Sequence, residues 1–270
     1  MAVVFDGRFN TLGNFVGYGL QANGVDTTGF ASPTGVSGRL ELMLDPYGSG
    51  DQVCRHTLYD TDAEAAAGQR SEYYYQPAGA LPKTLWYWFA IFIPADWDSS
   101  KRMVIMQQHD TPDGGDSTTR TPTMIGYLDT NRLIYLPNSY DPNAVSTPHP
   151  NFNRLCLATD PAFGRWQEWV MKVGWSCVPG AGTLDMWIDR RKVYVETAQI
   201  NTYNDTALPH VKQGVYDYYH VSGFGTRRMY SKGVLVSDTA HASFNAFMTE
   251  AGWPSKTELE MVTPLALSIA

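Results

Sequence analysis

Side chains capable of acid–base chemistry occur in three short stretches of this 270-residue sequence. In one of them, residues 104–110, an apolar run ends in Gln107 and His109. Side chains two residues apart point to the same face of a β-strand, so this carboxamide and imidazole are expected to lie side by side. Strict alternation would also place Ile105 on that face and Met106 on the other. We expect Gln107 and His109 to form the floor of a groove that binds sugars.

Two further stretches show the same spacing of polar residues. The first is a predicted strand over residues 69–75, and the second is a predicted strand over residues 210–218. If these strands are neighbours of the Gln107/His109 strand in one sheet, their polar faces combine into a single patch. The predicted patch contains Arg70, Glu72, Tyr74, Gln107, His109, His210, Lys212, Tyr216 and Tyr218.

This set of side chains suits β-elimination in a uronic-acid chain. A base removes the proton at C5, beside the carboxylate, and an acid protonates the departing glycosidic oxygen. Arg70 and Gln107 would hold the uronate carboxylate and so make the C5 proton more acidic. His109 titrates in the right range for a general base. Tyr216 would protonate the leaving oxygen, or would act as both base and acid if Lys212 lowers its pKa.

Other site chemistries lack their usual sequence signals. We find no obvious pair of catalytic carboxylates, nucleophile elbow or P-loop. The three cysteines (54, 156 and 177) have no metal-ligand spacing, and one disulfide or three thiols are equally compatible with them. Asp110, Asp113 and Asp116 do not match a calcium loop and are expected to keep a loop soluble. We therefore expect no metal and no cofactor.

Composition narrows the choice of partner. The formal charge of −7 argues against nucleic acid, whose phosphates need a basic excess. It also disfavours a highly sulfated, heparin-like substrate. Aromatic residues are plentiful, which suits both strands and sugar binding. No apolar run is long enough to cross a membrane, and the first residues do not form a signal peptide. A secreted, extracellular or virion-associated protein fits these features.

The elements expected to position the patch are mostly strands. Residues 85–93 are apolar on both faces and end before Pro94, which favours a central strand. Residues 166–175 and 183–189 alternate and flank a Pro-Gly turn, which favours an antiparallel hairpin. Helical composition is convincing only over residues 240–251. We therefore predict an all-β protein, a jelly roll or concanavalin A-like sandwich of two antiparallel sheets with little helix.

The whole chain, residues 1–270, is expected to form one domain. Its core would span about residues 65–240, with an N-terminal strand and loops before it and a C-terminal helix and tail after it. Residues 137–159 show little periodicity and are expected to form a long loop. Loops of this length in compact domains are more often functional than accidental.

The three stretches also resemble a known family. Arg-x-Glu at 70–72, Gln-x-His at 107–109 and Lys-x-Gly-x-Tyr at 212–216 occur in the order found in jelly-roll polysaccharide lyases. The closest likeness is to the heparin lyase I and glucuronan lyase group, with alginate lyases more distant, and it covers roughly residues 65 to 240. The resemblance implies elimination by a histidine and a tyrosine, with glutamine and arginine at the uronate carboxylate.

One position departs from the alginate-lyase pattern. His210 stands where those enzymes have a tyrosine, which leaves Tyr216 as the acid or base candidate of the third motif. Together with the negative net charge, this favours a weakly charged uronan or a mixed capsular polysaccharide as the substrate. Two alternatives remain: a jelly roll that binds glycans without cutting them, and a virion structural protein. A phage-borne capsule depolymerase would combine the last with the enzyme.

Overall fold

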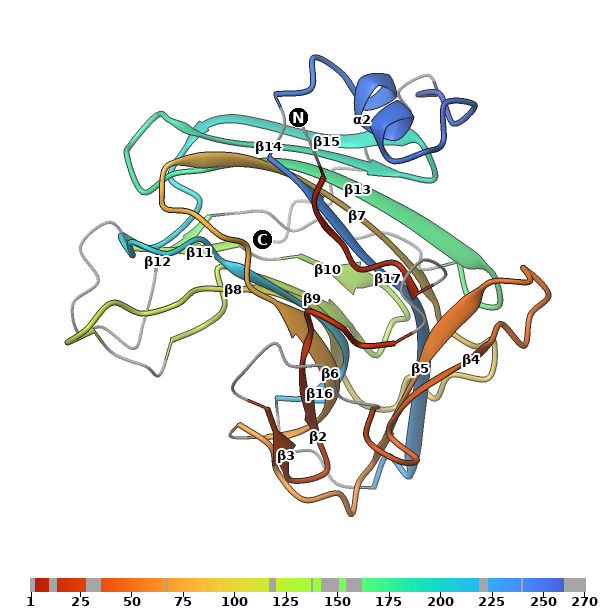
Figure 1. Cartoon of the computed structure of the whole chain (residues 1–270). Helices are drawn as coiled ribbons and strands as arrows, with labels where there is room; N and C mark the ends of the chain where they lie inside the picture. The colour runs from red at the N-terminus through yellow and green to blue at the C-terminus, as the bar shows by residue number, and fades with distance from the viewer. Residues whose placement is uncertain are drawn as a thin grey trace.

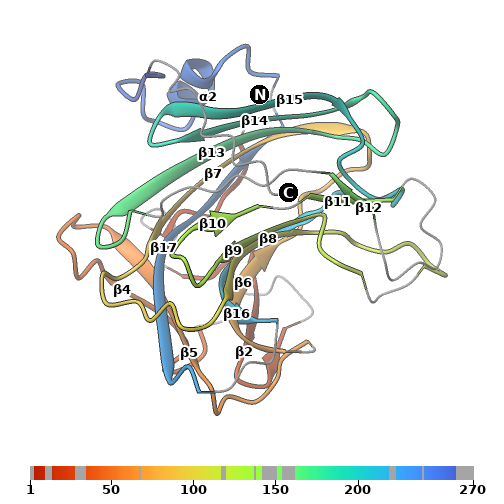
Figure 2. The same ribbon diagram turned by 180° about the vertical axis from the view of Figure 1, so that it is seen from behind.

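Two antiparallel β-sheets pack face to face and form the body of the molecule (Figures 1 and 2). The structure is a computed structural model that describes residues 3–9, 14–27, 35–66, 68–116, 120–136, 138–141, 151–153, 162–218, 223–238 and 240–259. The predicted all-β sandwich with little helix is confirmed. No helix among these residues is long and apolar enough to cross a membrane.

We call the first layer sheet A. Its strands lie in the order β15-β14-β13-β7-β17-β5-β4, and β1 pairs with β17. Each strand pair is antiparallel, and the predicted hairpin of β13 and β14 is present. The strands of sheet A are β1 (Val3–Asp6), β4 (Leu40–Leu44), β5 (Gln52–Tyr59), β7 (Lys83–Phe92), β13 (Trp166–Trp175), β14 (Gly182–Ile188), β15 (Arg191–Gln199) and β17 (Thr226–Ser237).

We call the second layer sheet B. Its strands lie in the order β12-β11-β9-β8-β16-β6-β2-β3, and β10 pairs with β9. The three strands that carry the predicted patch, β8, β16 and β6, are therefore neighbours. The strands of sheet B are β2 (Gly19–Ala22), β3 (Val25–Asp26), β6 (Gln69–Tyr75), β8 (Met103–His109), β9 (Met124–Leu128), β10 (Ile134–Tyr135), β11 (Asn138–Tyr140), β12 (Asn151–Asn153) and β16 (His210–Asp217).

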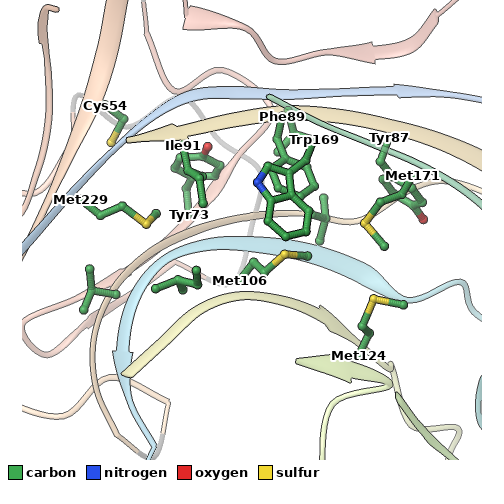
Figure 3. Packing of buried hydrophobic residues seen from close by; sticks show 14 of the residues in the cluster. Cys54, Tyr73, Tyr87, Phe89, Ile91, Met106, Met124, Trp169, Met171 and Met229 are labelled. Carbon is green, nitrogen blue, oxygen red and sulfur yellow. The ribbon is translucent and has the colours of Figure 1, made fainter. Parts of the chain in front are cut away.

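The main core lies between the sheets. Phe89 of β7 and Trp169 of β13 stack with ring centroids 5.9 Å apart and face side chains such as Met106 of sheet B (Figure 3). Burial of this apolar surface drives the two layers together. The strands of sheet B bend away from the cluster, so that their hollow side faces outward (Figure 3).

A helix covers part of the outer face of sheet A and explains why β7 is apolar on both faces. Helix α2 (Phe244–Glu250) begins after Ser243, whose hydroxyl accepts a hydrogen bond from the amide of Ala246. Phe247 of α2 stacks on Trp86 of β7, with ring centroids 5.1 Å apart. The sandwich thus has a second apolar cluster outside sheet A, and the expected helix within residues 240–251 is present.

The regular alternation expected along residues 104–110 is wrong at one residue. Pairing with β9 shifts register between Val104 and Met106, which indicates a β-bulge. Ile105 and Met106 both pack into the main core, whereas Val104 packs outside it against Tyr216. Ile105 therefore does not share the face of Gln107. The extra residue at the bulge shifts the inward–outward alternation by one position just before Gln107 and His109.

The N-terminal part of the chain contributes to both sheets. β1, β4 and β5 belong to sheet A, and β2 pairs with β6 in sheet B. β5 lies beside β17, inside sheet A. Residues before 65, expected as one strand and loops around the core, thus complete both layers.

Candidate active site

Sheet B presents most of its polar side chains on the hollow, outward side. Residues between them, such as Tyr73, Val211 and Val215, point inward to the core. The register places the outward residues in rows across β8, β16 and β6. These rows are His109 with His210; Gln107 with Lys212 and Tyr74; Gly214 with Glu72; and Tyr216 with Arg70. We call this surface the polar face.

Two histidines form one end of the polar face. The rings of His109 and His210 stack with centroids 5.1 Å apart. Nδ1 of His109 lies 2.9 Å from the backbone carbonyl oxygen of Asp110, which can only accept a hydrogen bond. Nδ1 must therefore carry the proton, and Nε2 keeps its lone pair. Burial and the charge of Lys212 lower the pKa of His109 to about 3, so the ring is neutral at pH 7.

A buried ion cluster lies directly behind His109. Oδ1 of Asp110 is 3.4 Å from Nδ1 of His109, and Oδ2 is 2.8 Å from a guanidinium nitrogen of Arg120. The same nitrogen contacts Asp205 at 2.7 Å, and all three ion-paired side chains are 1% exposed. Burial raises the pKa of Asp110 to about 6 against the opposing effect of Arg120. The expectation that Asp110 only keeps a loop soluble is therefore wrong.

A network centred on Glu72 occupies the middle of the polar face. Nε2 of Gln107 donates to Oε1 of Glu72 at 2.7 Å, and Arg70 pairs with Oε2 at 3.2 Å. Oε1 of Gln21, on β2, accepts from both Arg70 and Lys212 at 3.2 Å. Each of these side chains is buried. Such charges are tolerated away from water because each one has a partner.

Lys212 is the ammonium group of this network. Burial lowers its pKa to about 8, although Glu72 opposes the shift. Its side chain is 5% exposed. The ammonium group has three N–H donors, of which one is used by Gln21. Lys212 can therefore give further hydrogen bonds to an anion on the polar face while it remains charged.

Tyr216 lies at the other end of the polar face. It lies two rows beyond Lys212 along β16, and the pairing of β16 with β8 shifts register between Gln213 and Tyr216. The guanidinium of Arg70 lies 3.7 Å from the centre of its ring. Burial raises the pKa of Tyr216 to about 12 against the effect of Arg70. The idea that Lys212 lowers this pKa is therefore wrong, because the adjacent cation is Arg70 and the net shift is upward.

The two remaining tyrosines of the predicted patch have separate positions. Tyr74 lies across from Lys212, and its hydroxyl donates to the backbone oxygen of Thr27. Burial raises its pKa. Tyr218 follows the end of β16, is 45% exposed, and contacts Tyr216 edge to face. The histidines and Tyr74 thus lie toward one end, and Tyr216 and Tyr218 toward the other.

Sequence reasoning missed three residues that support this face. Gln21 lies in a Gly- and Asn-rich stretch that gave no strand signal, and Arg120 and Asp205 lie outside regular elements. Only their contacts with Lys212 and Asp110 reveal a role. Within the described ranges, no three His, Cys, Asp or Glu side chains are grouped so as to hold a metal ion. Cys54 and Cys177 are free thiols.

Comparisons with solved structures identify the fold of this molecule. The glucuronan lyase from the fungus Trichoderma reesei superposes with a TM-score of 0.65 at 18% identity, over 82% of this chain and 94% of that one. The alginate lyase PA1167 from Pseudomonas aeruginosa gives 0.55 at 14%, over 84% and 100%. A GH131 β-glucanase domain from Podospora anserina gives 0.56 at 14%, over 89% and 98%. The fold is thus that of jelly-roll lyases and glycoside hydrolases, and fold alone does not select the reaction.

The amino-acid sequence distinguishes between a lyase and a glycoside hydrolase. The pattern of the polysaccharide lyase family matches residues 11–234, most of the chain. The chain belongs to the polysaccharide lyase family and is an enzyme that acts on polysaccharides, as the three motifs predicted. No curated protein sequence matches it.

Proposed function

We propose that the enzyme cleaves a uronic-acid-containing polysaccharide by β-elimination on the polar face of sheet B. The observation that carries this proposal is the state of His109. Its ring is neutral, its Nδ1 proton is held by the carbonyl of Asp110, and Nε2 is left as a base. Lys212 and Gln107 occupy the next row, where an anion would complete their hydrogen bonding.

The first task is to neutralise the uronate carboxylate. Lys212 supplies an ammonium group, and the amide of Gln107 has a second N–H beyond the one given to Glu72. Hydrogen bonds from these groups stabilise the negative charge that grows on the carboxylate as the C5 proton leaves. The bound carboxylate also offsets the charge of Lys212, which removes one cause of the low pKa of His109. Substrate binding therefore makes His109 a stronger base.

The elimination then moves one electron pair along the sugar ring. Nε2 of His109 takes the C5 proton, and the C–H electrons form a double bond between C4 and C5. The bond from C4 to the glycosidic oxygen breaks, and this oxygen leaves with its electron pair. The buried carboxylate of Asp110, beside Nδ1, stabilises the imidazolium that results.

Tyr216 is assigned as the acid that protonates the leaving oxygen. With a pKa of about 12 it remains protonated at any pH at which the enzyme would act. Arg70, 3.7 Å from its ring, stabilises the phenolate that proton donation leaves behind. Glu72 bonds both Arg70, which lies against Tyr216, and Gln107, two residues from His109, and this short link supports placing Tyr216 and His109 at one sugar residue. Tyr74, nearer to the histidines, is the competing tyrosine.

The charges favour a substrate of low charge density. Two cations, Arg70 and Lys212, accompany one anion, Glu72, on the polar face, and the whole chain carries −7. One uronate at the cleaved bond fits this balance better than a continuous polyanion. We propose a weakly charged uronan or a mixed capsular polysaccharide, met outside the cell by a secreted or virion-borne enzyme.

A panel of purified uronans tests the proposal. Cleavage is followed by the ultraviolet absorbance of the new C4=C5 double bond, and we expect it to be lost in His109→Ala. Product without this absorbance would indicate hydrolysis and would refute elimination. Polymer binding without any product would instead favour a glycan-binding module, the alternative drawn from the sequence.

A further inference from the structure

A pocket on the outer face of sheet A takes no part in the elimination. It encloses about 210 Å³ and lies among outward-facing residues of β7, β13 and β17 and the segment that follows α2. Trp88 of β7 and Trp166 of β13 belong to its walls, whereas the alternate residue Phe89 points into the main core. The pocket therefore opens on the opposite side of the sandwich from the polar face.

The tryptophans of the chain distinguish this pocket from the rest of the surface. All eight lie in described parts of the chain, and six of them are buried. The two with partly exposed side chains, Trp166 and Trp253, both line this pocket. Trp88 is 3% exposed and lies 4.6 Å from Trp253, ring centre to ring centre. Indole surface kept within reach of water is a favoured contact for the C–H groups of a sugar ring.

Hydrogen-bonding groups are fixed beside the indoles. Oε1 of Glu168 accepts from Nε1 of Trp88 at 2.6 Å and from Nζ of Lys256 at 2.5 Å. This leaves Oε2 of the same carboxylate as an acceptor for a hydroxyl group. Lys232 lies 4.7 Å over the ring of Trp166 and pairs with Asp51 at 2.5 Å. Sugar hydroxyls need such donors and acceptors around an apolar contact.

The charges of the lining cancel, which bears on the kind of ligand. Three cations and three carboxylates surround the pocket, so it offers no net attraction to an anion. The polar face differs, because its two cations exceed its one carboxylate. The six charged residues of the pocket are Arg8, Lys232 and Lys256, and Asp51, Glu168 and Asp189.

We propose that this pocket is a second carbohydrate site that binds one neutral sugar residue. Its volume accommodates a single ring, its aromatic walls suit a pyranose, and its balanced charge favours an uncharged one. It would hold a polysaccharide on the face remote from the elimination site. The competing explanation is that these tryptophans only anchor the segment after α2.

Indole N–H resonances in nuclear magnetic resonance spectra separate the two explanations. The wild-type enzyme is labelled with ¹⁵N at its tryptophan indoles and titrated with the methyl glycosides of glucose, galactose and mannose. We expect at least one of them to shift the signals of Trp88, Trp166 and Trp253 with a roughly millimolar Kd, while core Trp169 and Trp175 stay unchanged. The methyl glycoside of glucuronic acid should bind more weakly. These probes contain no cleavable chain, so the result does not depend on lyase activity.

Matched variants complete the test. Glu168→Gln keeps the size of the side chain but removes its charge, and it should weaken binding about tenfold, or about 1.4 kcal/mol. Glu258→Gln alters the same kind of bond, from Nε1 of Trp187 to a glutamate at 2.8 Å, outside the pocket, and should leave the Kd unchanged. Trp253→Ala should abolish the shifts at Trp88 and Trp166. Failure of all three neutral glycosides to shift these signals, or equal effects of both glutamine variants, would overturn the proposal.

Discussion

The two outward faces of this sandwich are built from opposite kinds of residue. On sheet B, the outward positions hold a buried network of charged and amide groups around Glu72, with two neutral histidines at one end. On sheet A, several of them hold tryptophan, partly covered by α2, with separate charged side chains such as Glu168 and Lys232 beside them. Both faces come from the same alternation along antiparallel strands. Under the two proposals made above, this jelly roll would use one layer for reaction and the other for attachment.

The largest expected contrast is between histidines on the two faces. His109→Ala should lower kcat by about 10³-fold, because it removes the general base. His241, which pairs with Glu250 on the outer side of sheet A, provides the matched control. His241→Ala should retain most of the activity in the same absorbance assay. A comparable loss in both variants would mean that the polar face is not the reaction site.

Buried and exposed arginines should differ almost as much in stability. Arg120→Met leaves Asp110 and Asp205 without their cation and should cost about 3–5 kcal/mol of unfolding free energy. Arg165, 60% exposed, pairs with Asp189 at the rim of sheet A, and Arg165→Met should cost about 0–1 kcal/mol. Urea unfolding measures both values. Equal costs would show that the cluster behind His109 does not hold the polar face in place.

Two tyrosines sharpen the assignment of the acid. Tyr216→Phe should lower kcat by about 10²-fold, whereas Tyr74→Phe should change it less than about tenfold. Both substitutions keep the ring and remove only the hydroxyl, so the folded structure should be retained. If Tyr74→Phe causes the larger loss, the acid is Tyr74, beside Lys212, and the acid and the base lie at the same end of the polar face.

The smallest effect concerns pH. With its pKa at about 8, Lys212 is charged below that pH, so kcat/KM for a uronan should fall as pH rises through about 8. On the acid side, activity should fall first near pH 6, where Asp110 is protonated, and again near pH 3, where His109 is protonated. Lys212→Arg should remove the alkaline limb, since arginine stays charged. Lys192→Arg, which alters a lysine paired with Asp185 on sheet A, should leave the profile unchanged. An alkaline limb that survives in Lys212→Arg would assign it to another group.

Much of the fold could be predicted because alternation is a local property. The outward positions of β6 and β16 follow from residues two apart, and β7 was identified by its apolar run. The bulge at Ile105 could not be predicted in this way, because it depends on the partner strand β9. β5 gave no clear signal because its buried residues include His56, whose imidazole bonds Ser231 inside the core.

The site was predictable only where its residues follow strand spacing. Gln107 and His109 are two residues apart in one strand, so the sequence alone predicted that they share a face. Asp110 also belongs to the site, but its role depends on Arg120 and Asp205, which are distant in sequence and outside regular elements. The pocket outside sheet A was not predicted for the same reason. Its lining comes from β7, β13, β17 and the segment after α2, which are distant in sequence, so no local sequence pattern predicts that they lie together.

The fully enclosed carboxylate of Glu72 has a consequence for turnover. Its two oxygens already receive hydrogen bonds from Gln107 and Arg70, so an acidic sugar that binds the remaining N–H groups of Gln107 and Lys212 lies close to a resident anion. Repulsion between the two carboxylates lowers the net affinity below that of a site with cations alone. An enzyme that must release each cleaved end of a long uronate-containing chain benefits from this moderate affinity.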